Sequence, residues 1–479
     1  MAVTTGKMEG LQVQLKVRPA LCVVALFLCL WFLPCPEGID PKGWKVFAVF
    51  VSTIFGFLVK PMPLGAIVMT ALTVLSATKV LTIREVVSGF GNSSVWLIVM
   101  AFFISRGFTK TGLGTRIGYM FIRAIGHTTL GLAYALGFTN YVLAPAMPSS
   151  TARSGGTVCP LTLAVARAYG SDPELGTQRK IGSYLIFNSF QTNYPVGAAF
   201  MTAMAGNTLA AGFAAAQGVE ITWLSWWWAG FAPSIASILS VPLFLLFIYP
   251  PEIKHSPEAR ALAIEKLKEM GPMSMPEKTM LGTFFLLLFM WVVGSYIGLD
   301  ATTAAFIGIT FLVYAGVLTW QDVLSEKGAY DCLVWFSGLI LMAGLLNKLG
   351  VIKWITGGLG STISGLPWPV IVFCLACSSM YIAYCFASST ALISAVYSAY
   401  LAIGLAAGTP PMLTAMVIAF FCNLQACLTY YSGGSAPIFF ATGYVESGDW
   451  LRCGFLVSVL HLVVWFGVGS IWWKLIGLY

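Results

Sequence analysis

Two clusters of hydroxyl side chains interrupt apolar stretches of the sequence, and each half of the chain carries one of them. The clusters are Ser149, Ser150 and Thr151 in the first half, and Ser388, Ser389 and Thr390 in the second half. Serine and threonine hydroxyls donate hydrogen bonds and cap helix N-termini, where a partial positive charge attracts anions. Arg153 adds a full positive charge beside the first cluster. Residues of these types indicate a site for a carboxylate or a similar anion.

Acidic side chains are missing from the long stretches around both clusters. The sequence has no Asp or Glu between Val86 and Ser171, or between Cys332 and Val445. Cation pumps and proton relays generally use buried carboxylates. The lack of carboxylates around Arg153 therefore favours an anion over a cation as the ligand. The alternative is that Arg153 is only a charge at the rim of the structure.

Two further polar breaks follow the clusters, at 202–207 and at 428–437. The candidate residues in them are Thr202 and Asn207 in the first break, and Thr429, Ser432 and Gly433 in the second. Unwound segments of this kind expose backbone carbonyl and N–H groups to a substrate or an ion. The alternative for these segments and for both clusters is that small residues simply let helices pack closely.

The composition indicates which elements must position these residues. Of the 479 residues, 58% are hydrophobic and only 9% are charged, whereas an ordinary soluble domain has about 25% charged residues. Because so few charges could not cover a soluble surface, the apolar runs must face lipid. At about 20 residues per span, we expect about 11 transmembrane helices plus re-entrant helical hairpins at 128–167 and 367–408. The predicted fold class is an all-α polytopic membrane protein.

A polar stretch divides the chain almost in half. We expect residues 1–42 to form an N-terminal arm and a first transmembrane helix, because no small-x-small cleavage site follows its apolar run. Residues 43–249 then form a first repeat with a cytoplasmic-side hairpin, 250–278 a cytoplasmic linker, and 279–479 a second repeat with an outer-side hairpin. The lack of an Arg- and Ser-rich transit peptide favours a bacterial plasma membrane over an organelle envelope.

The two halves share short sequence matches at a nearly constant offset. Leu81-Thr82 matches Leu318-Thr319 at an offset of 237 residues (318 − 81), and the first hydroxyl cluster matches the second at 239 (388 − 149). Internal duplication is a hallmark of secondary transporters. With the N-terminus in the cytoplasm, most Lys and Arg residues fall on the inner face. The two repeats then have opposite topologies, so their hairpins enter from opposite faces.

Other classes of protein find little support in the sequence. The chain has three histidines and no His-Glu-x-x-His or Gly-x-Ser-x-Gly motif, which argues against a membrane-embedded enzyme. Cys374-x-x-Cys377 lacks a second pair, so we interpret this spacing as helix packing. The net charge of +8 reflects basic residues on one membrane face rather than nucleic-acid binding. Paired hairpins favour alternating access over an open channel.

These motifs resemble those of the divalent anion–sodium symporter family, whose members carry a Ser-Asn-Thr signature at each of two hairpin tips. Here the signature positions are the two hydroxyl clusters, with Ser150 and Ser389 in the middle. The resemblance covers nearly the whole chain. Four segments are most similar to the chloroplast 2-oxoglutarate/malate translocators and the bacterial citrate/succinate and tartrate/succinate antiporters: 144–156, 110–114, 443–445 and 472–479.

The resemblance implies a homodimer in the lipid bilayer, with a fixed scaffold and a transport domain that moves as an elevator. Substrate would contact both hairpin tips and the neighbouring unwound segments. The function it implies is exchange of C4/C5 dicarboxylates of the 2-oxoglutarate/malate type. The alternative is a sodium-coupled symporter of dicarboxylates, citrate or sulfate.

Two departures from the family pattern bear on sodium. Relatives use the middle Asn of each signature in their cation sites, and both of these residues are Ser in this chain. The substitution disfavours sodium coupling, and any sodium would bind near Ser150 and Ser389. No other metal or cofactor is expected. Leu392 occupies a position where the exchanger branch often has His.

Overall fold

The computed structural model describes residues 7–8, 11–12, 15–354, 365–386 and 388–479. Parts of the predicted N-terminal arm and residue 387 of the predicted second hairpin lie outside these ranges. Apart from two paired strands, β1 (Lys7–Met8) and β2 (Leu11–Gln12), the described elements are helical. The predicted all-α class is confirmed.

Seven of the described helices are long and apolar enough to cross a membrane. They are α2 (Pro41–Val59), α11 (Trp223–Ile248), α13 (Met275–Ile297), α16 (Lys327–Lys348), α18 (Trp368–Tyr381) together with η5 (Ile382–Cys385), α19 (Ser389–Ala406) and α22 (Ser447–Leu475). A bent pair, which makes an eighth span if it is counted as one helix, has an angle of 51° where α4 (Ile83–Ser88) and η1 (Gly89–Gly91) meet α5 (Ser93–Thr111). Shorter apolar helices are α1 (Val17–Phe32), α3 (Leu64–Ala77), α14 (Ala301–Tyr314) and α20 (Pro411–Leu424). The chain is therefore a multi-span membrane protein.

The remaining elements connect or interrupt these spans. In the first half they are α6 (Leu113–Ile125), α7 (Thr129–Leu143), η2 (Ala144–Ala146), η3 (Thr151–Val158), α8 (Cys159–Ala168), α9 (Gly182–Ala199), η4 (Met201–Ala203) and α10 (Ala205–Ala215). The linker contains α12 (Pro257–Glu269). In the second half they are α15 (Trp320–Leu324), η5 (Ile382–Cys385), η6 (Gln425–Cys427) and α21 (Ala436–Phe440).

The order of elements in the first half recurs in the second. Helices α3 and α14 begin and end at the same offset of 237 residues (301 − 64 and 314 − 77). A short helix with a Thr capping box follows each of them, α4 after Thr82 and α15 after Thr319. Each series then continues with a long helix and a broken hairpin, α7–α8 in the first half and α18–α19 in the second.

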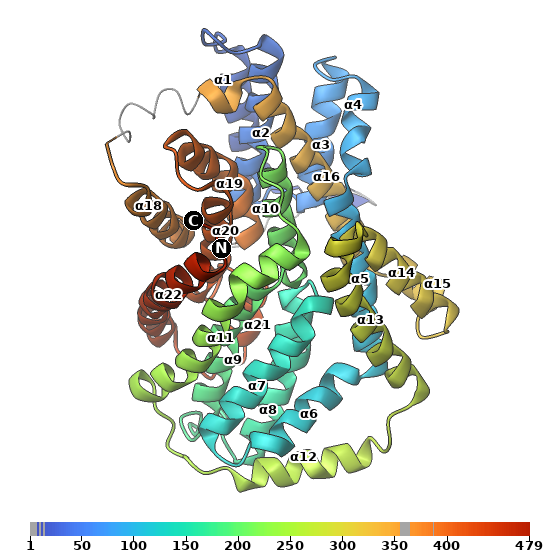
Figure 1. The fold of residues 1–479 in the computed structure, drawn as a ribbon, viewed down its shortest axis with the longest axis vertical. Coiled ribbons are helices and arrows are strands. Elements are labelled where there is room, and N and C mark those ends of the chain that lie inside the picture. Colours follow the sequence, from blue (N-terminus) through green and yellow to red (C-terminus); the bar gives the residue numbers. More distant parts are fainter. Residues whose placement is uncertain (1–6, 9–10, 13–14, 355–364, 387) are drawn as a thin grey trace.

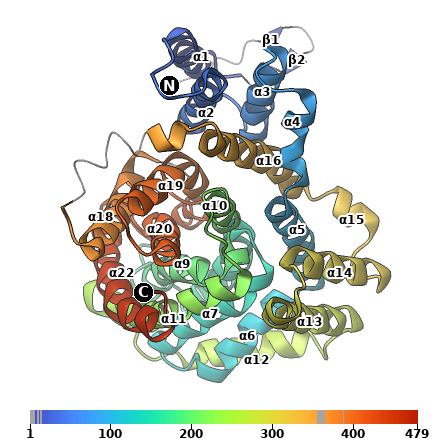
Figure 2. The same ribbon diagram turned by 45° about the horizontal axis from the view of Figure 1, so that its top comes forward.

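The helices form two groups that lie side by side in Figure 2. We call the first group the arc; it comprises α1–α5 and α13–α16. The second group, the cluster, comprises α7–α11 and α18–α22. In the first half of the chain, helix α6 connects the arc to the cluster. It packs against α7 and the linker helix α12. Figure 1 places α7 and α8 in the half of the molecule that carries α12, and α18 and α19 in the opposite half. Entry of the two hairpins from opposite membrane faces stays a prediction.

Candidate functional site

The first hairpin breaks because proline interrupts its helical hydrogen bonding. Pro148 has no backbone N–H and restricts the residue before it, and Met147 accordingly leaves the helical region, with φ −122° and ψ 87°. The chain turns helical again directly after Ser149, whose Oγ accepts a hydrogen bond from the backbone N–H of Ala152 at 3.2 Å. The second arm begins as the π-helix η3, a form that is often found at functional sites.

The second hairpin ends its break in the same way. Ser388 has an extended backbone, with φ −163° and ψ 126°, and its Oγ accepts a hydrogen bond from the N–H of Ala391 at 3.4 Å. Helix α19 starts at the next residue. The first serine of each cluster therefore caps the arm that follows it, which leaves the second and third hydroxyls of each cluster to make other contacts.

Arg153 lies at the centre of the first tip and is completely buried, with 0% of its surface exposed. Its Nε donates to Oδ1 of Asn140 at 2.7 Å, and its Nη1 donates to the carbonyl oxygens of Met147 and Ala203 at 2.6 and 2.7 Å. Its Nη2 donates to Oδ1 of Asn193 at 3.3 Å. All four hydrogen bonds go to neutral oxygens, so they hold the guanidinium in place without cancelling its charge.

Asn193, on α9, connects this arginine to the second half of the chain. Its Oδ1 accepts from Arg153 and from Nδ2 of Asn140, each at 3.3 Å. Its own Nδ2 donates to Oγ of Ser435 at 3.3 Å. A continuous hydrogen-bond network therefore runs from the first hairpin tip to the end of the unwound segment 428–435.

A second network joins the other tip to the same segment. Ser389 Oγ donates to the carbonyl oxygen of Ser432 at 3.1 Å and accepts from Nε2 of Gln425 at 2.9 Å. Thr429 Oγ1 accepts from the backbone N–H of Ser432 at 3.0 Å, and the two hydroxyls are also hydrogen-bonded to each other. The hydroxyls thereby stabilise a turn that has no helical hydrogen bonding of its own.

Glycines let the first tip approach this unwound segment closely. A Cβ at Gly434 would lie 2.5 Å from Oγ1 of Thr151, and a Cβ at Gly433 would lie 3.0 Å from the hydroxyl of Tyr194. A side chain at Gly434 would displace the Thr151 hydroxyl, and one at Gly433 would press against Tyr194. The segment 428–435 is therefore the point at which both tips meet.

The predicted site residues differ in their exposure. Thr151 is exposed and Ser149, Ser150, Ser388 and Thr390 are partly buried, whereas Arg153, Ser389, Thr429, Ser432 and Gly433 are buried. Thr202 and Asn207 are also buried, and both bond to the protein itself. Thr202 Oγ1 donates to the carbonyl oxygen of Pro145 at 2.6 Å, and Asn207 Nδ2 donates to that of Gly197 at 2.7 Å. Substrate contact by these residues stays a prediction.

Four residues of the two networks were not predicted from the sequence: Asn140, Asn193, Gln425 and Ser435. A signal for Asn193 was present, because α9 places Asn188, Gln191 and Asn193 within an apolar span, and all of its residues are buried. Amide side chains at membrane depth need polar partners. Gln425 gave a weaker signal, because with Asn423 it forms only a short polar interruption at the end of an apolar run, 36 residues beyond Ser389.

Sodium near Ser150 or Ser389 would require oxygen atoms that face a cation. At the second tip, an N–H group of Gln425 points at the Ser389 hydroxyl, the oxygen that such an ion would use. At the first tip, the buried Arg153 carries a full positive charge. Both of these groups repel a cation and attract an anion. The first tip therefore fits a carboxylate better than a sodium ion, whereas at the second tip the buried Oε1 of Gln425 has no hydrogen-bond partner among the described residues.

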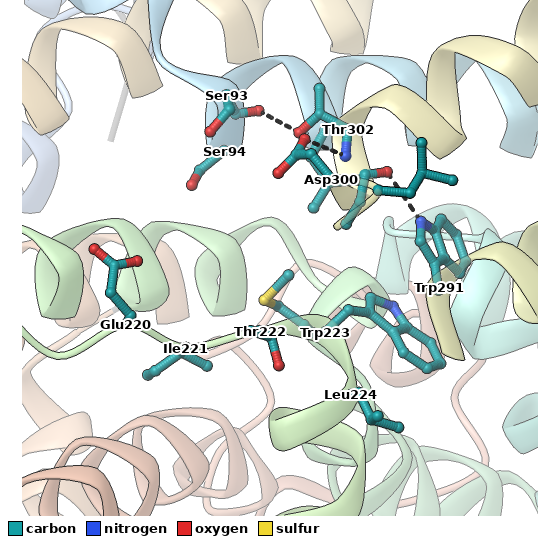
Figure 3. A pocket seen from close by; sticks show the side chains of 14 residues that line it. Ser93, Ser94, Glu220, Ile221, Thr222, Trp223, Leu224, Trp291, Asp300 and Thr302 are labelled. Carbon is teal, nitrogen blue, oxygen red and sulfur yellow. Dashed lines mark hydrogen bonds between the residues drawn. The ribbon is translucent and has the colours of Figure 1, made fainter. Parts of the chain in front are cut away.

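A separate cavity of about 220 Å³ lies between the arc and the cluster (Figure 3). Its lining includes the carboxylates of Glu220 and Asp300, which disfavour an anionic ligand. Trp223 of the cluster and Trp291 of the arc stack there with ring centroids 5.2 Å apart. Trp223 Nε1 also donates to Oγ1 of Thr202 at 3.0 Å, so the cavity adjoins the first polar break. It is distinct from the meeting point of the two tips.

Residues 14–479 match the family described as the sodium:sulfate symporter transmembrane region. The chain belongs to this family. YflS of Bacillus subtilis (strain 168), a transporter named for malate, is 47% identical over 99% of both chains. Dicarboxylate transporter 1 of Spinacia oleracea, a chloroplast protein, is 44% identical over 97% of this chain and 82% of its own.

Two solved structures share the fold at low sequence identity. The Neisseria gonorrhoeae efflux pump MtrF has 13% identity and a TM-score of 0.58, covering 95% of this chain and 94% of its own. The Alcanivorax borkumensis transporter YdaH has 13% identity and a TM-score of 0.55, with 96% and 98% covered. The family and its members are transporters, so this chain is a transporter rather than an enzyme. Its spans and its Bacillus relative agree with the expected bacterial plasma membrane.

Proposed function

We propose that this transporter exchanges C4/C5 dicarboxylates, of the 2-oxoglutarate/malate type, across the membrane. Relatives with 44% and 47% identity bear names that refer to dicarboxylates and to malate. The observation that carries the proposal is the burial of Arg153 among neutral partners at the first tip. A buried, uncancelled positive charge stabilises an anion, and charge-assisted hydrogen bonds are about twice as strong as neutral ones.

The two tips supply different parts of this recognition. The first tip offers the field of Arg153 together with the exposed Thr151 hydroxyl, while the second offers Ser389, Thr390 and the turn at 429–435. One carboxylate of the substrate would bind near each tip. Both tips meet the same unwound segment, so they lie close to each other. A short C4 or C5 dianion could therefore reach both tips at once.

Exchange also agrees with the energetics of a charged substrate. A dianion that enters an inside-negative cell works against about 2.3 kcal/mol per charge at 100 mV, or about 4.6 kcal/mol in total. Exchange for another dianion moves no net charge and needs no coupled ion. The fixed charge of Arg153 thereby takes the role that a bound cation has in a symporter.

The motion proposed for this exchange is an elevator, with the arc as the scaffold and the cluster as the moving unit of each protomer in a homodimer. The link α6 joins the arc at Gly112, whose φ of +74° lies in the left-handed region that glycine adopts without strain. In a dimer fixed through the arc, cross-links between arcs of two protomers would leave exchange intact. Cross-links between the arc and the cluster of one protomer would stop it.

Sodium-coupled symport is the second candidate, because the family description names sodium and sulfate. Counterflow of labelled 2-oxoglutarate into proteoliposomes loaded with unlabelled malate separates the two candidates. Exchange predicts full counterflow with choline in place of sodium, and efflux that needs an external dicarboxylate. A strict sodium requirement would overturn the exchange proposal, and sulfate uptake without dicarboxylate transport would overturn the substrate class. Protein-free liposomes provide the background.

A further inference from the structure

An apolar groove of about 450 Å³ runs between α1, α2 and α3, away from the transport site. Helix α1 lines the groove with Ala20, Val23, Val24, Phe27 and Leu28. The other two helices line it with Val49, Ile67, Ala71 and Val74. Gly56 shapes the groove, because a Cβ there would lie 3.1 Å from Ile67 and 3.8 Å from Val23. Helix α1 has no buried residue, and five of its residues line this groove.

The hydroxyl groups that line the groove have no free hydrogen-bond donor for a polar ligand. Ser52, Thr53 and Thr70 each donate their hydroxyl hydrogen to the carbonyl oxygen four residues earlier in their own helix, at 2.7, 2.8 and 2.9 Å. Their donors are therefore satisfied within the helix. What remains facing the groove is hydrocarbon, so the fitting occupant is a hydrocarbon chain.

Basic side chains gather at one end of the groove, where Leu15, Pro61 and Met62 line it. The backbone N–H of Lys16 donates to the carbonyl oxygen of Pro61 at 3.0 Å, which places Lys16 next to Lys60. Arg18 follows in the first turn of α1. All three basic residues are exposed, and among the described residues none of them forms an ion pair.

The backbone at Lys60 is also unusual. Lys60 ends α2 in the left-handed conformation, with φ 50°, at a position where glycine is the ordinary residue. A residue with a side chain is strained there. Lys79, after α3, has the same kind of backbone with φ 58°, so the strain alone assigns no role to the Lys60 ammonium group.

We propose that the groove binds an acyl chain of an anionic phospholipid, whose phosphate lies against Lys16, Arg18 and Lys60. In the expected orientation this end of the groove faces the cytoplasm, where anionic lipids are concentrated, and basic pockets between transmembrane helices on that side bind anionic headgroups. The lipid would fill the space between α1 and the arc and so fix α1 against its neighbours.

Native mass spectrometry of the delipidated full chain tests the site. The probes are dioleoyl phosphatidylglycerol and dioleoyl phosphatidylcholine, which have the same chains and differ in headgroup charge. We expect tighter binding of phosphatidylglycerol. Replacement of Lys16, Arg18 and Lys60 by Gln together should lower that affinity by about fivefold per charge, or about a hundredfold in all. Phosphatidylcholine should lose much less, because its choline offsets the charge of its phosphate. Thr70→Trp, which fills the groove from an exposed position, should weaken both lipids.

Lys79→Gln is the matched control, because Lys79 is another exposed lysine with a left-handed backbone, φ 58°, beyond the other end of α3. Equal affinity for the two lipids, or an equal loss in Lys79→Gln, would overturn the proposal. Competition by inorganic phosphate would identify a free anion as the ligand instead. Conversion of dimers to monomers by Thr70→Trp, with lipid binding unchanged, would show that a second copy covers the groove. The readout is lipid binding, so none of these results bears on dicarboxylate exchange.

Discussion

The tip of the first hairpin carries a buried guanidinium, whereas the tip of the second is built from neutral hydroxyl and amide groups. The same sequence pattern caps both second arms, through Ser149 and Ser388. After the cap the two tips diverge, because Arg153 is held by four oxygens in one and Ser389 is held by Gln425 and Ser432 in the other. A duplicated fold thus provides two similarly capped tips, and only one of them supplies charge.

The two capping boxes near the start of each repeat show a related difference. Glu85 pairs with Lys42 of its own half at 2.7 Å, whereas Asp322 pairs with Lys110 of the other half at 2.6 Å. The equivalent carboxylates therefore make different connections. One of them holds the first half together and the other joins the two halves of the arc.

The largest effect is expected from Arg153→Ala. Loss of the charge-assisted interaction with a buried carboxylate should reduce exchange by about a hundredfold, equivalent to about 3 kcal/mol. Counterflow in proteoliposomes measures the effect, and size-exclusion chromatography checks that the variant is folded. Arg153→Lys keeps the charge and should retain more activity than the Ala variant. If a folded Arg153→Ala variant exchanged substrate at the wild-type rate, the charge of the first tip would have no part in the mechanism.

Asn193→Asp should have the next largest effect, because it places a carboxylate on the network that holds Arg153. The new pair would cancel the positive charge that a dianion needs, and we expect a loss of about thirtyfold in affinity. Asn193→Ser removes the amide without adding charge, and it should cost only about fivefold. Binding measured by thermal stabilisation with 2-oxoglutarate compares the two. Equal losses in both variants would mean that geometry, and not charge, distinguishes the first tip.

A smaller effect is expected at the neutral tip. Ser389→Ala removes two neutral hydrogen bonds, to Ser432 and from Gln425, and Gln425→Ala removes one of the same two. Each variant should weaken substrate binding by about fivefold. Because the two side chains bond to each other at 2.9 Å, the double variant should lose little more than either single variant. Losses that multiply in the double variant would show that the two side chains act on the substrate separately.

The smallest effect is expected from Lys110→Met, which removes the connection between the two halves of the arc. The hydrogen bond from Lys110 lowers the pKa of Asp322 from its usual 3.8 to about 2. A lowered folded-state pKa stabilises the protein above pH 4, and this stabilisation is lost as the pH falls from 4 towards 2. The pair is partly exposed, so the loss should be below about 1 kcal/mol.

Thermal unfolding from pH 3 to pH 7 measures this loss. The wild type and Lys110→Met should differ by a constant, small amount above pH 4 and converge below it. A gap that widens towards low pH would contradict the assignment, and a loss of exchange at neutral pH would show that the pair has a role in transport.

Much of the fold could be predicted from the sequence, because hydrophobic runs and the repeat offset carry long-range information. The matched positions of Thr82 and Thr319 correspond to equivalent capping boxes in the structure. The partners of the tip residues could not be predicted. Asn193 contacts both Arg153 and Ser435, and Gly434 admits Thr151, only because two distant segments fold together. Local sequence shows which groups are polar, but not which of them meet.

The most direct test is a structure of the protein with bound 2-oxoglutarate in the absence of sodium. The account predicts one ligand at the meeting point of the two tips, with one carboxylate near Thr151 and Arg153 and the other near Ser389 and the turn at 429–435. A ligand bound instead in the acidic cavity beside Trp223 and Trp291, or a ligand that touches only one tip, would contradict it.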